Sequence, residues 1–364
     1  MSGDKPRITS PADAQLAELC AQLRQLAPDL QATGWPSQQL ACCARYGVFE
    51  WFISPAYGGQ AWSDADIIRG YLELSTACLT TTFVITQRTG ACQRIEASEN
   101  ETVKRELLPD LASGKRFATV GISHLTTSRR HLGKAVLRAQ ETPGGFRLDG
   151  FSPWVTGAPH AELVVTGATL DDGRQILVAL PIDTPGVTVP PAADLVGLTE
   201  SQTGPVQCDR VEIDRRWLLA GPVEQVMQQG LGAKTGGLQT STLAIGLAGS
   251  AIDYLELETT NRPELRAPTE SLRFEWQTLK AELLFAAAGE PVCSNAELRS
   301  RSNSVVLRAT QAALAAAKGS GYVKGHPAGR WCSEALFFLV WSCPQPVMAA
   351  NLCELAGLNA GTVE

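Results

Sequence analysis

Apolar residues recur at intervals of three and four along the first part of the chain. Four leucines between Leu16 and Leu26 share one face of a helix predicted over residues 12–30. Ser10 is a suitable N-cap for this helix, and Pro11 suits its first position. Further helices are expected at residues 37–46, 65–81 and 99–111. We therefore predict a helical N-terminal domain, residues 1–115.

The pattern changes after residue 116, where short β-type runs recur between turn signals. Glycine-rich turns are expected at residues 142–145 and 171–173. Strands are expected at residues 117–122, 135–139, 145–149, 163–168, 175–180 and 206–213. This pattern predicts a middle β domain, residues 116–221, built as a barrel or a sandwich.

The helical period returns after Gly221 and continues almost to the end of the chain. Four long helices are expected at residues 223–260, 269–288, 295–317 and 328–355, the last with a break at Pro344 and Pro346. Long helices with short connections are typical of a bundle. The expected fold class is therefore α+β multidomain, with a C-terminal four-helix bundle at residues 222–364.

Composition is typical of a folded globular protein, with 44% hydrophobic and 19% charged residues among 364. The net charge of −6 gives no electrostatic reason to expect nucleic-acid binding. No apolar run approaches the ~18 residues of a membrane span, and no signal-peptide core is visible, so a cytoplasmic location is expected. Ten scattered cysteines and four separated histidines predict neither a disulfide framework nor a metal site.

Trp154 and Thr156 are the most informative pair of residues in the middle domain. On an extended strand they point to the same side, whereas Val155 points to the other. A large ring can pack against a planar heterocycle while a neighbouring hydroxyl supplies an orienting hydrogen bond. The pair is consistent with a cofactor site, but also with ordinary core and edge positions of a strand.

The order of domains, with Trp154-Val-Thr-Gly157 in the middle, resembles the acyl-CoA dehydrogenase superfamily. Tyr57-Gly-Gly59 is similar to the E-x-Y-G-G loop of that family, and Gly319-Ser-Gly-Tyr322 is similar to its G-x-G-Y passage. Pro327 and Arg330 follow at the matching distance. The resemblance implies that FAD binds between the β domain and the bundle of a homodimer or homotetramer.

The same resemblance implies a set of FAD contacts. Trp154 would pack beside the isoalloxazine, Thr156 would reach its N5 region, and Ile122 with Ser123 would contact its pyrimidine ring. The other residues implied to bind FAD are Ser128 and Arg129 in the following loop, Arg262 and Gln277 toward a neighbouring subunit, and Gly319 and Gly321 at the adenosine half. Each of these residues also has an ordinary structural interpretation as a strand, surface or turn position.

The position of the catalytic base departs from the family pattern. Acyl-CoA dehydrogenation needs a base for the α proton, and the family uses a Glu. That position aligns with Ser342, and the alternative position in the first bundle helix aligns with Gln239. Neither side chain can act as a base unaided. Glu334 is the nearest carboxylate in sequence, although a structural ion pair is the favoured interpretation of that residue.

Three functions follow from the resemblance. The first is an FAD-dependent, acyl-CoA dehydrogenase-like oxidoreductase that acts on an acyl thioester or a similar small molecule and whose base has been lost, moved or replaced. The second is a flavin-dependent monooxygenase on the same fold, and the third is a non-catalytic member. The sequence does not specify the substrate, its chain length or the electron acceptor of the flavin.

Overall fold

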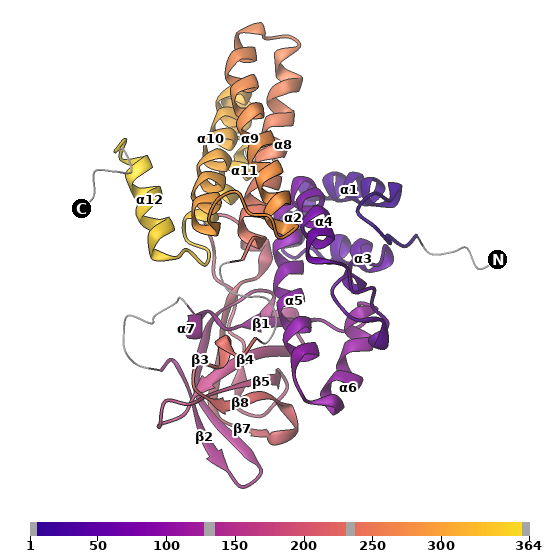
Figure 1. The fold of residues 1–364 in the computed structure, drawn as a ribbon, viewed down its shortest axis with the longest axis vertical. Coiled ribbons are helices and arrows are strands. Elements are labelled where there is room, and N and C mark those ends of the chain that lie inside the picture. Colours follow the sequence, from indigo (N-terminus) through magenta and orange to yellow (C-terminus); the bar gives the residue numbers. More distant parts are fainter. Residues whose placement is uncertain (1–5, 127–134, 231–236, 359–364) are drawn as a thin grey trace, which may run out of the picture.

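The computed structural model describes residues 6–126, 135–230 and 237–358 (Figure 1). Helices make up its N-terminal and C-terminal parts, and a sheet lies between them in the sequence. The N-terminal helices are α1 (Ala14–Leu26), α2 (Leu30–Thr33), α3 (Ser37–Arg45), α4 (Asp64–Ala77), α5 (Leu79–Ala97) and α6 (Glu101–Ala112). Residues 6–126, 135–230 and 237–358 contain no helix long and apolar enough to cross a membrane.

Helix α5 is the main element that the sequence pattern did not predict. The helix expected at residues 65–81 ends at Ala77, because Cys78 has an extended backbone (φ −160°, ψ 106°), and α5 begins directly after it. Most of α5 is buried, including Thr80, Arg88 and Arg94. A helix that is enclosed on all sides has no single apolar stripe, so its periodicity is weak.

The described residues of the middle part form one mixed sheet of eight strands. They are β1 (Ala118–Gly121), β2 (Leu137–Thr142), β3 (Gly145–Val155), β4 (Leu163–Thr169), β5 (Gln175–Pro181), β6 (Val187–Thr188), β7 (Gly204–Asp214) and β8 (Leu218–Val223). Their order is β6-β7-β3-β2-β4-β5-β8, and β1 pairs in parallel with β4. The short helix α7 (Ser123–Thr126) follows β1.

Residues 237–358, the described C-terminal part, contain three long α-helices and two short ones. They are α8 (Gln239–Thr259), α9 (Arg266–Ala287), α10 (Asn295–Gly321), α11 (Pro327–Ala335) and α12 (Gln345–Leu355). The predicted start of the first helix at residue 223 was wrong, because residues 218–223 form β8. The predicted fourth helix is divided at residues 336–344, so that α12 projects beside the long helices (Figure 1).

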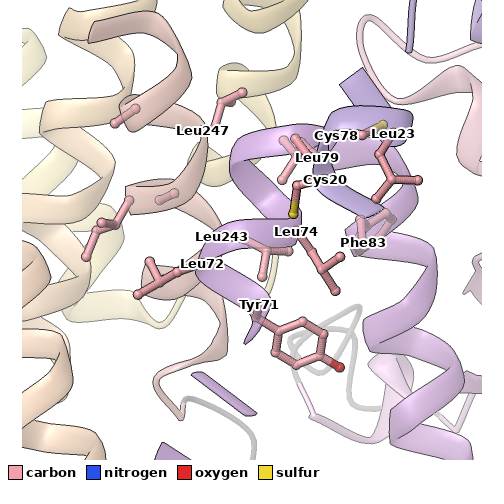
Figure 2. Close-up of a cluster of buried hydrophobic side chains, with 14 of the residues drawn as sticks. Cys20, Leu23, Tyr71, Leu72, Leu74, Cys78, Leu79, Phe83, Leu243 and Leu247 are labelled. Carbon is pink, nitrogen blue, oxygen red and sulfur yellow. The ribbon is translucent and has the colours of Figure 1, made fainter. Parts of the chain in front are cut away.

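One hydrophobic core joins the N-terminal helices to the first long helix of the bundle. Leu72 and Leu74 of α4 pack in the same cluster as Leu243 and Leu247 of α8 (Figure 2). The backbones approach closely at Gly246, where a methyl group would lie 2.6 Å from the Ser75 Cβ. The shared core fixes the first turn of α8 relative to α4 and α5. The division into domains at residues 115 and 221 stays a prediction.

Candidate active site

A cavity of about 600 Å³ lies where the three parts of the chain meet. Its walls come from α5, from β1 and α7, from the end of β3, from the loop that precedes β7, and from the starts and ends of C-terminal helices. The lining residues are Phe83, Thr86, Gln87, Gly90, Gln93, Arg94, Val120, Ile122, Ser123, Thr126, Trp154, Thr156, Leu195, Val196, Gly197, Leu198, Ser201, Thr203, Gly237, Gln239, Thr240, Ser333, Leu336, Phe337, Val340, Trp341 and Ser342.

Trp154 and Thr156 both line this cavity, whereas Val155 packs into a separate buried hydrophobic cluster. The Trp154 side chain is 49% exposed, so its ring is available to a ligand. Thr156 is buried, and its hydroxyl lies 3.0 Å from the Thr203 hydroxyl. Thr203 was not predicted, because the loop that contains it is far from β3 in sequence. The strand therefore presents an open aromatic ring beside an ordered hydroxyl group.

Ile122 and Ser123 line the cavity next to this strand. The buried Ser123 Oγ has no hydrogen-bond partner in the described part of the chain. His124, the next residue, is turned into the protein, where its Nε2 lies 2.8 Å from the Gly167 carbonyl oxygen. Burial lowers the pKa of His124, so the imidazole is neutral at physiological pH. An unsatisfied buried hydroxyl in a cavity wall indicates where a ligand can form a hydrogen bond.

Helix α5 supplies one wall of the cavity, and none of its residues was predicted. Gln87 and Gln93 contribute amide groups, and Arg94, a residue that is only 4% exposed, contributes a guanidinium. Arg94 Nη1 donates a hydrogen bond to the Gly90 carbonyl oxygen at 2.7 Å. Burial lowers the pKa of Arg94 to about 10, which leaves it charged at neutral pH. The wall is thus polar and carries a positive charge.

The opposite wall ends at Ser342, the residue aligned with the family's base. Ser342 has a positive φ of 46°, which is uncommon for a non-glycine residue. The preceding Trp341 stacks on Phe337 at a centroid distance of 5.2 Å, and Phe83 contacts both rings edge-on. Gln239 lines the cavity as well. Both proposed base positions therefore border the cavity, with side chains that do not titrate.

Glu334 lies outside the set of lining residues. It is only 3% exposed, and its Oε1 accepts a hydrogen bond from the Thr80 hydroxyl at 2.9 Å. Arg330 Nε lies 4.0 Å from the same oxygen. Burial raises the pKa of Glu334. This carboxyl group connects α5 to α11 and does not face the cavity.

Arg94 has the only ionisable side chain among the described lining residues, which include no Asp, Glu, His, Cys, Tyr or Lys. The described residues also contain no group of three or more His, Cys, Asp or Glu that could hold a metal ion. Proton abstraction by a carboxylate or an imidazole has no candidate among these lining residues. The wall chemistry instead provides aromatic surface, hydroxyls, amides and one cation.

The remaining predicted FAD contacts lie elsewhere. Arg262 donates to the Ala316 carbonyl oxygen at 2.5 Å and pairs with Glu258 and Glu264 at 3.3 and 3.4 Å. Gln277 borders a separate groove between α8 and α9. Gly319 and Gly321 lie at the end of α10, and Ser128 and Arg129 are outside the described residues. The cavity of one chain therefore brings together four of the predicted contacts, namely Ile122, Ser123, Trp154 and Thr156.

Comparisons with known proteins place this arrangement in a family. Residues 14–115 match the acyl-CoA dehydrogenase N-terminal domain. The probable acyl-CoA dehydrogenase YngJ of Bacillus subtilis is 23% identical over 327 residues, which cover 84% of this chain and 86% of the relative. Glutaryl-CoA dehydrogenase of Mycobacterium smegmatis, solved in complex with FADH2, is 17% identical with a TM-score of 0.77, covering 96% of this chain and 97% of its own.

A monooxygenase has the same fold. Dibenzothiophene monooxygenase of Paenibacillus sp. A11-2 is 16% identical, with a TM-score of 0.76 over 94% of this chain and 96% of its own. The N-terminal part of the chain matches the acyl-CoA dehydrogenase family, and the chain resembles an acyl-CoA dehydrogenase over most of its length. The resemblance and the fold class predicted from the sequence are thus confirmed.

Proposed function

We propose that this chain binds FAD and is an acyl-CoA dehydrogenase-like flavoprotein oxidoreductase acting on an acyl thioester or a similarly shaped small molecule. The observation that carries the proposal is the convergence of Ile122, Ser123, Trp154 and Thr156 on one cavity. The likeness in fold to a glutaryl-CoA dehydrogenase solved in complex with FADH2 supports it.

The residues present fit a flavin ring. The unsatisfied Ser123 hydroxyl needs a partner, which a pyrimidine edge of a flavin can supply. Trp154 offers a half-exposed aromatic face for a flat ring, and Thr156 holds a hydroxyl at its side. Arg262, Gln277, Gly319 and Gly321 are proposed to contact the FAD of a neighbouring subunit in a homodimer or homotetramer.

Bound FAD supplies a hydride acceptor. The protein's own residues orient the substrate and exclude water from it. Phe83, Phe337 and Trp341 form an apolar end of the cavity that suits an acyl chain or a flat ring. Ser342 and Gln239 border the cavity without a group that can accept the α proton at neutral pH. Dehydrogenation here would require a base from outside the described lining residues.

A flavin monooxygenase is the second candidate. It is favoured by one observation, which is that no carboxylate, imidazole, thiol or phenol stands among the described lining residues. Oxygenation does not depend on a carboxylate at position 342. The monooxygenase of known structure with the same fold supports this alternative.

An absorbance spectrum of the purified protein, before and after incubation with FAD, tests the proposal first. We expect a bound oxidised flavin. Anaerobic addition of acyl-CoAs of several chain lengths then distinguishes the two reactions. Bleaching by an acyl-CoA supports dehydrogenation, whereas substrate conversion that requires both an external reductant and oxygen supports oxygenation. A protein that stays colourless after incubation with FAD contradicts both.

A gain-of-function variant sharpens this test. Ser342→Glu adds a carboxylate to the cavity wall, and Gln239→Glu adds one at the alternative position. A positioned general base contributes about 10²–10⁴-fold, so at least one variant should bleach faster with acyl-CoA than the wild type. Ser342→Gln is the matched control, because it has nearly the same volume without the charge. Equal rates in the glutamate and glutamine variants would show that a missing base does not limit the reaction.

A further inference from the structure

The face of helix α5 that lines the cavity is aromatic at one end and charged at the other. Phe83, Thr86, Gln87 and Gly90 follow one another at helical spacing along its lining face, and Arg94 lies near the other end of that face. Arg94 follows Phe83 by eleven residues, which is a rise of about 16 Å along the helix axis. The Phe83 end meets the Phe337 and Trp341 rings, whereas the Arg94 end is polar and charged.

The charged end of α5 faces β1. Gly90 makes this approach possible, because a methyl group there would lie 3.3 Å from both Arg94 Nη1 and Val120 Cγ1. Val120 and Ile122 both line the cavity, as alternate residues of an extended segment should. Arg94 therefore lies beside the stretch of chain that continues into Ile122 and Ser123.

The surroundings of Arg94 strengthen the effect of its positive charge on a neighbouring group. No Asp or Glu is found among the described lining residues, and the Arg94 side chain is almost fully shielded from water. A charge in such a setting acts more strongly on a neighbour than a charge at the protein surface, because solvent screening is weaker. A planar guanidinium also remains protonated over the physiological range.

We propose that Arg94 stabilises the negative charge of the reduced flavin and thereby raises the reduction potential of the bound cofactor. A hydride brings two electrons and one proton to the oxidised ring, so the reduced ring carries one negative charge unless a second proton is added. Charge near a flavin ring is one of the means by which proteins adjust its electronics. The inference rests on the proposed function, since it needs flavin in this cavity.

The position of Arg94 favours the flavin over a substrate carboxylate as its target. Arg94 borders the segment of Val120, Ile122 and Ser123, where the pyrimidine edge is proposed to lie. The aromatic end of the cavity, near Ser342, lies at the other end of the α5 face and is left for the substrate. A substrate group that needed the arginine would have to reach along the helix.

Three substitutions at one position test the inference. Arg94→Gln and Arg94→Met remove the charge but differ in polarity, whereas Arg94→Lys keeps the charge. The midpoint potential of the bound flavin is measured anaerobically against a reference dye. In the Gln and Met variants we expect the ratio of reduced to oxidised flavin at a fixed potential to fall about tenfold, a shift of about 30 mV for a two-electron couple. The Lys variant should stay within about threefold of the wild type.

Unchanged potentials in the Gln and Met variants, or an equal fall in the Lys variant, would overturn the inference. If the Gln and Met variants do not bind FAD, the pH dependence of the flavin potential in the wild type tests the inference. Its potential, followed into the mildly acidic range where free reduced flavin takes up a second proton, should change by about 30 mV per pH unit, as for one proton and two electrons. A slope of about 59 mV would mean that the reduced ring is neutral. A wild type that binds no FAD contradicts the proposed function instead.

Discussion

At the scale of single residues, Ser123 has the clearest unmet requirement. Its Oγ is buried at the cavity wall without a hydrogen-bond partner in the described chain. If flavin supplies that partner, Ser123→Ala should weaken FAD binding by the value of one hydrogen bond, about 0.5–1.5 kcal/mol or roughly 2–12-fold. The thermal midpoint of the apoprotein should stay the same or rise slightly, because the variant no longer buries an unsatisfied hydroxyl. A fluorescence titration with FAD and a melting curve measure the two effects.

Ser152→Ala is the matched control for this prediction. The Ser152 hydroxyl is buried close by, but it donates to the Gly121 carbonyl oxygen at 3.0 Å. Its loss should lower apoprotein stability by about 1 kcal/mol and affect FAD binding less. Should Ser123→Ala destabilise the apoprotein and leave FAD affinity unchanged, the hydroxyl would be structural and this assignment would be wrong.

Side-chain alternation explains which residues of the cavity could be predicted. Trp154 and Thr156 belong to one strand, so their common orientation follows from local geometry alone. Thr203 completes the hydroxyl pair with Thr156, but it lies 47 residues away in sequence. No local pattern connects such positions, because they meet only after β3 and β7 pair.

At the scale of elements, α5 shows the limit of periodicity. Amphipathic helices such as α4 and α6 carry a stripe of buried leucines or valines that the sequence reveals. Helix α5 is buried along most of its length and mixes threonines with arginines, so no stripe exists. The helix that contributes most to the cavity wall was therefore the one that sequence reasoning could not find.

The turn that carries Trp341 and Ser342 is held by two polar side chains of α10. Arg299 Nη2 donates to the Trp341 carbonyl oxygen at 2.7 Å, and its Nε donates to Asn303 Oδ1 at 3.1 Å. Asn303 in turn donates to the Phe338 carbonyl oxygen at 3.1 Å. Arg299 is only 5% exposed, so these bonds are shielded from water. They fix the backbone that leads into Ser342.

Arg299→Ala should therefore loosen the cavity wall as well as the fold. Removing the buried guanidinium leaves the Trp341 carbonyl oxygen and Asn303 Oδ1 without the donor that Arg299 supplies, at a cost of about 1–3 kcal/mol for each unsatisfied group. We expect a lower unfolding midpoint and weaker FAD or ligand binding, measured by denaturant titration and by ligand titration.

Arg308→Ala is the matched control on the same helix. Arg308 pairs with Glu275 near the surface, where its side chain is 46% exposed, so its loss should cost at most about 1 kcal/mol. Similar losses in the two variants would contradict a specific role of Arg299 in holding the turn.

At the scale of the whole molecule, the order of helical, sheet and helical parts could be predicted, but their contacts could not. The change of hydrophobic period at residues 116 and 221 marks where the type of structure changes. The last helix was predicted with a break at Pro344 and Pro346, and it is indeed divided before Gln345, around a turn with Ser342 at positive φ. The contacts of this turn with α10 and with the cavity could not be predicted, because they join residues far apart in sequence.

Glu334 is one of the polar links between these distant parts. Its carboxyl group joins Thr80 at the start of α5 to Arg330 on α11. Burial raises its pKa above the ordinary value of 4.5, although Arg330 and the Thr80 hydroxyl act in the opposite direction. The link is thus most stable while the carboxyl group is protonated.

The elevated pKa predicts a pH-dependent stability. The proton on Glu334 contributes stability fully below the unfolded-state pKa near 4.5, and that contribution is lost as pH rises through the higher folded-state pKa. Glu334→Gln cannot ionise and can still accept the Thr80 hydrogen bond. Its stability relative to the wild type should therefore increase with pH across this window, by about 1.4 kcal/mol for each unit of pKa elevation. Denaturant midpoints measured from about pH 4 to 8 follow the effect.

A second variant separates ionisation from packing. Thr80→Val removes the hydrogen bond that favours the carboxylate, so the pKa of Glu334 should rise further and the loss of stability with pH should extend to higher pH. The double variant Thr80→Val/Glu334→Gln should lose the part of the pH-dependent stability that comes from Glu334, because no carboxyl group remains at this link between α5 and α11. The prediction is contradicted if the stability difference between the wild type and Glu334→Gln is constant from about pH 4 to 8. The Glu334 carboxyl group would then keep one protonation state throughout, and the link would not respond to pH.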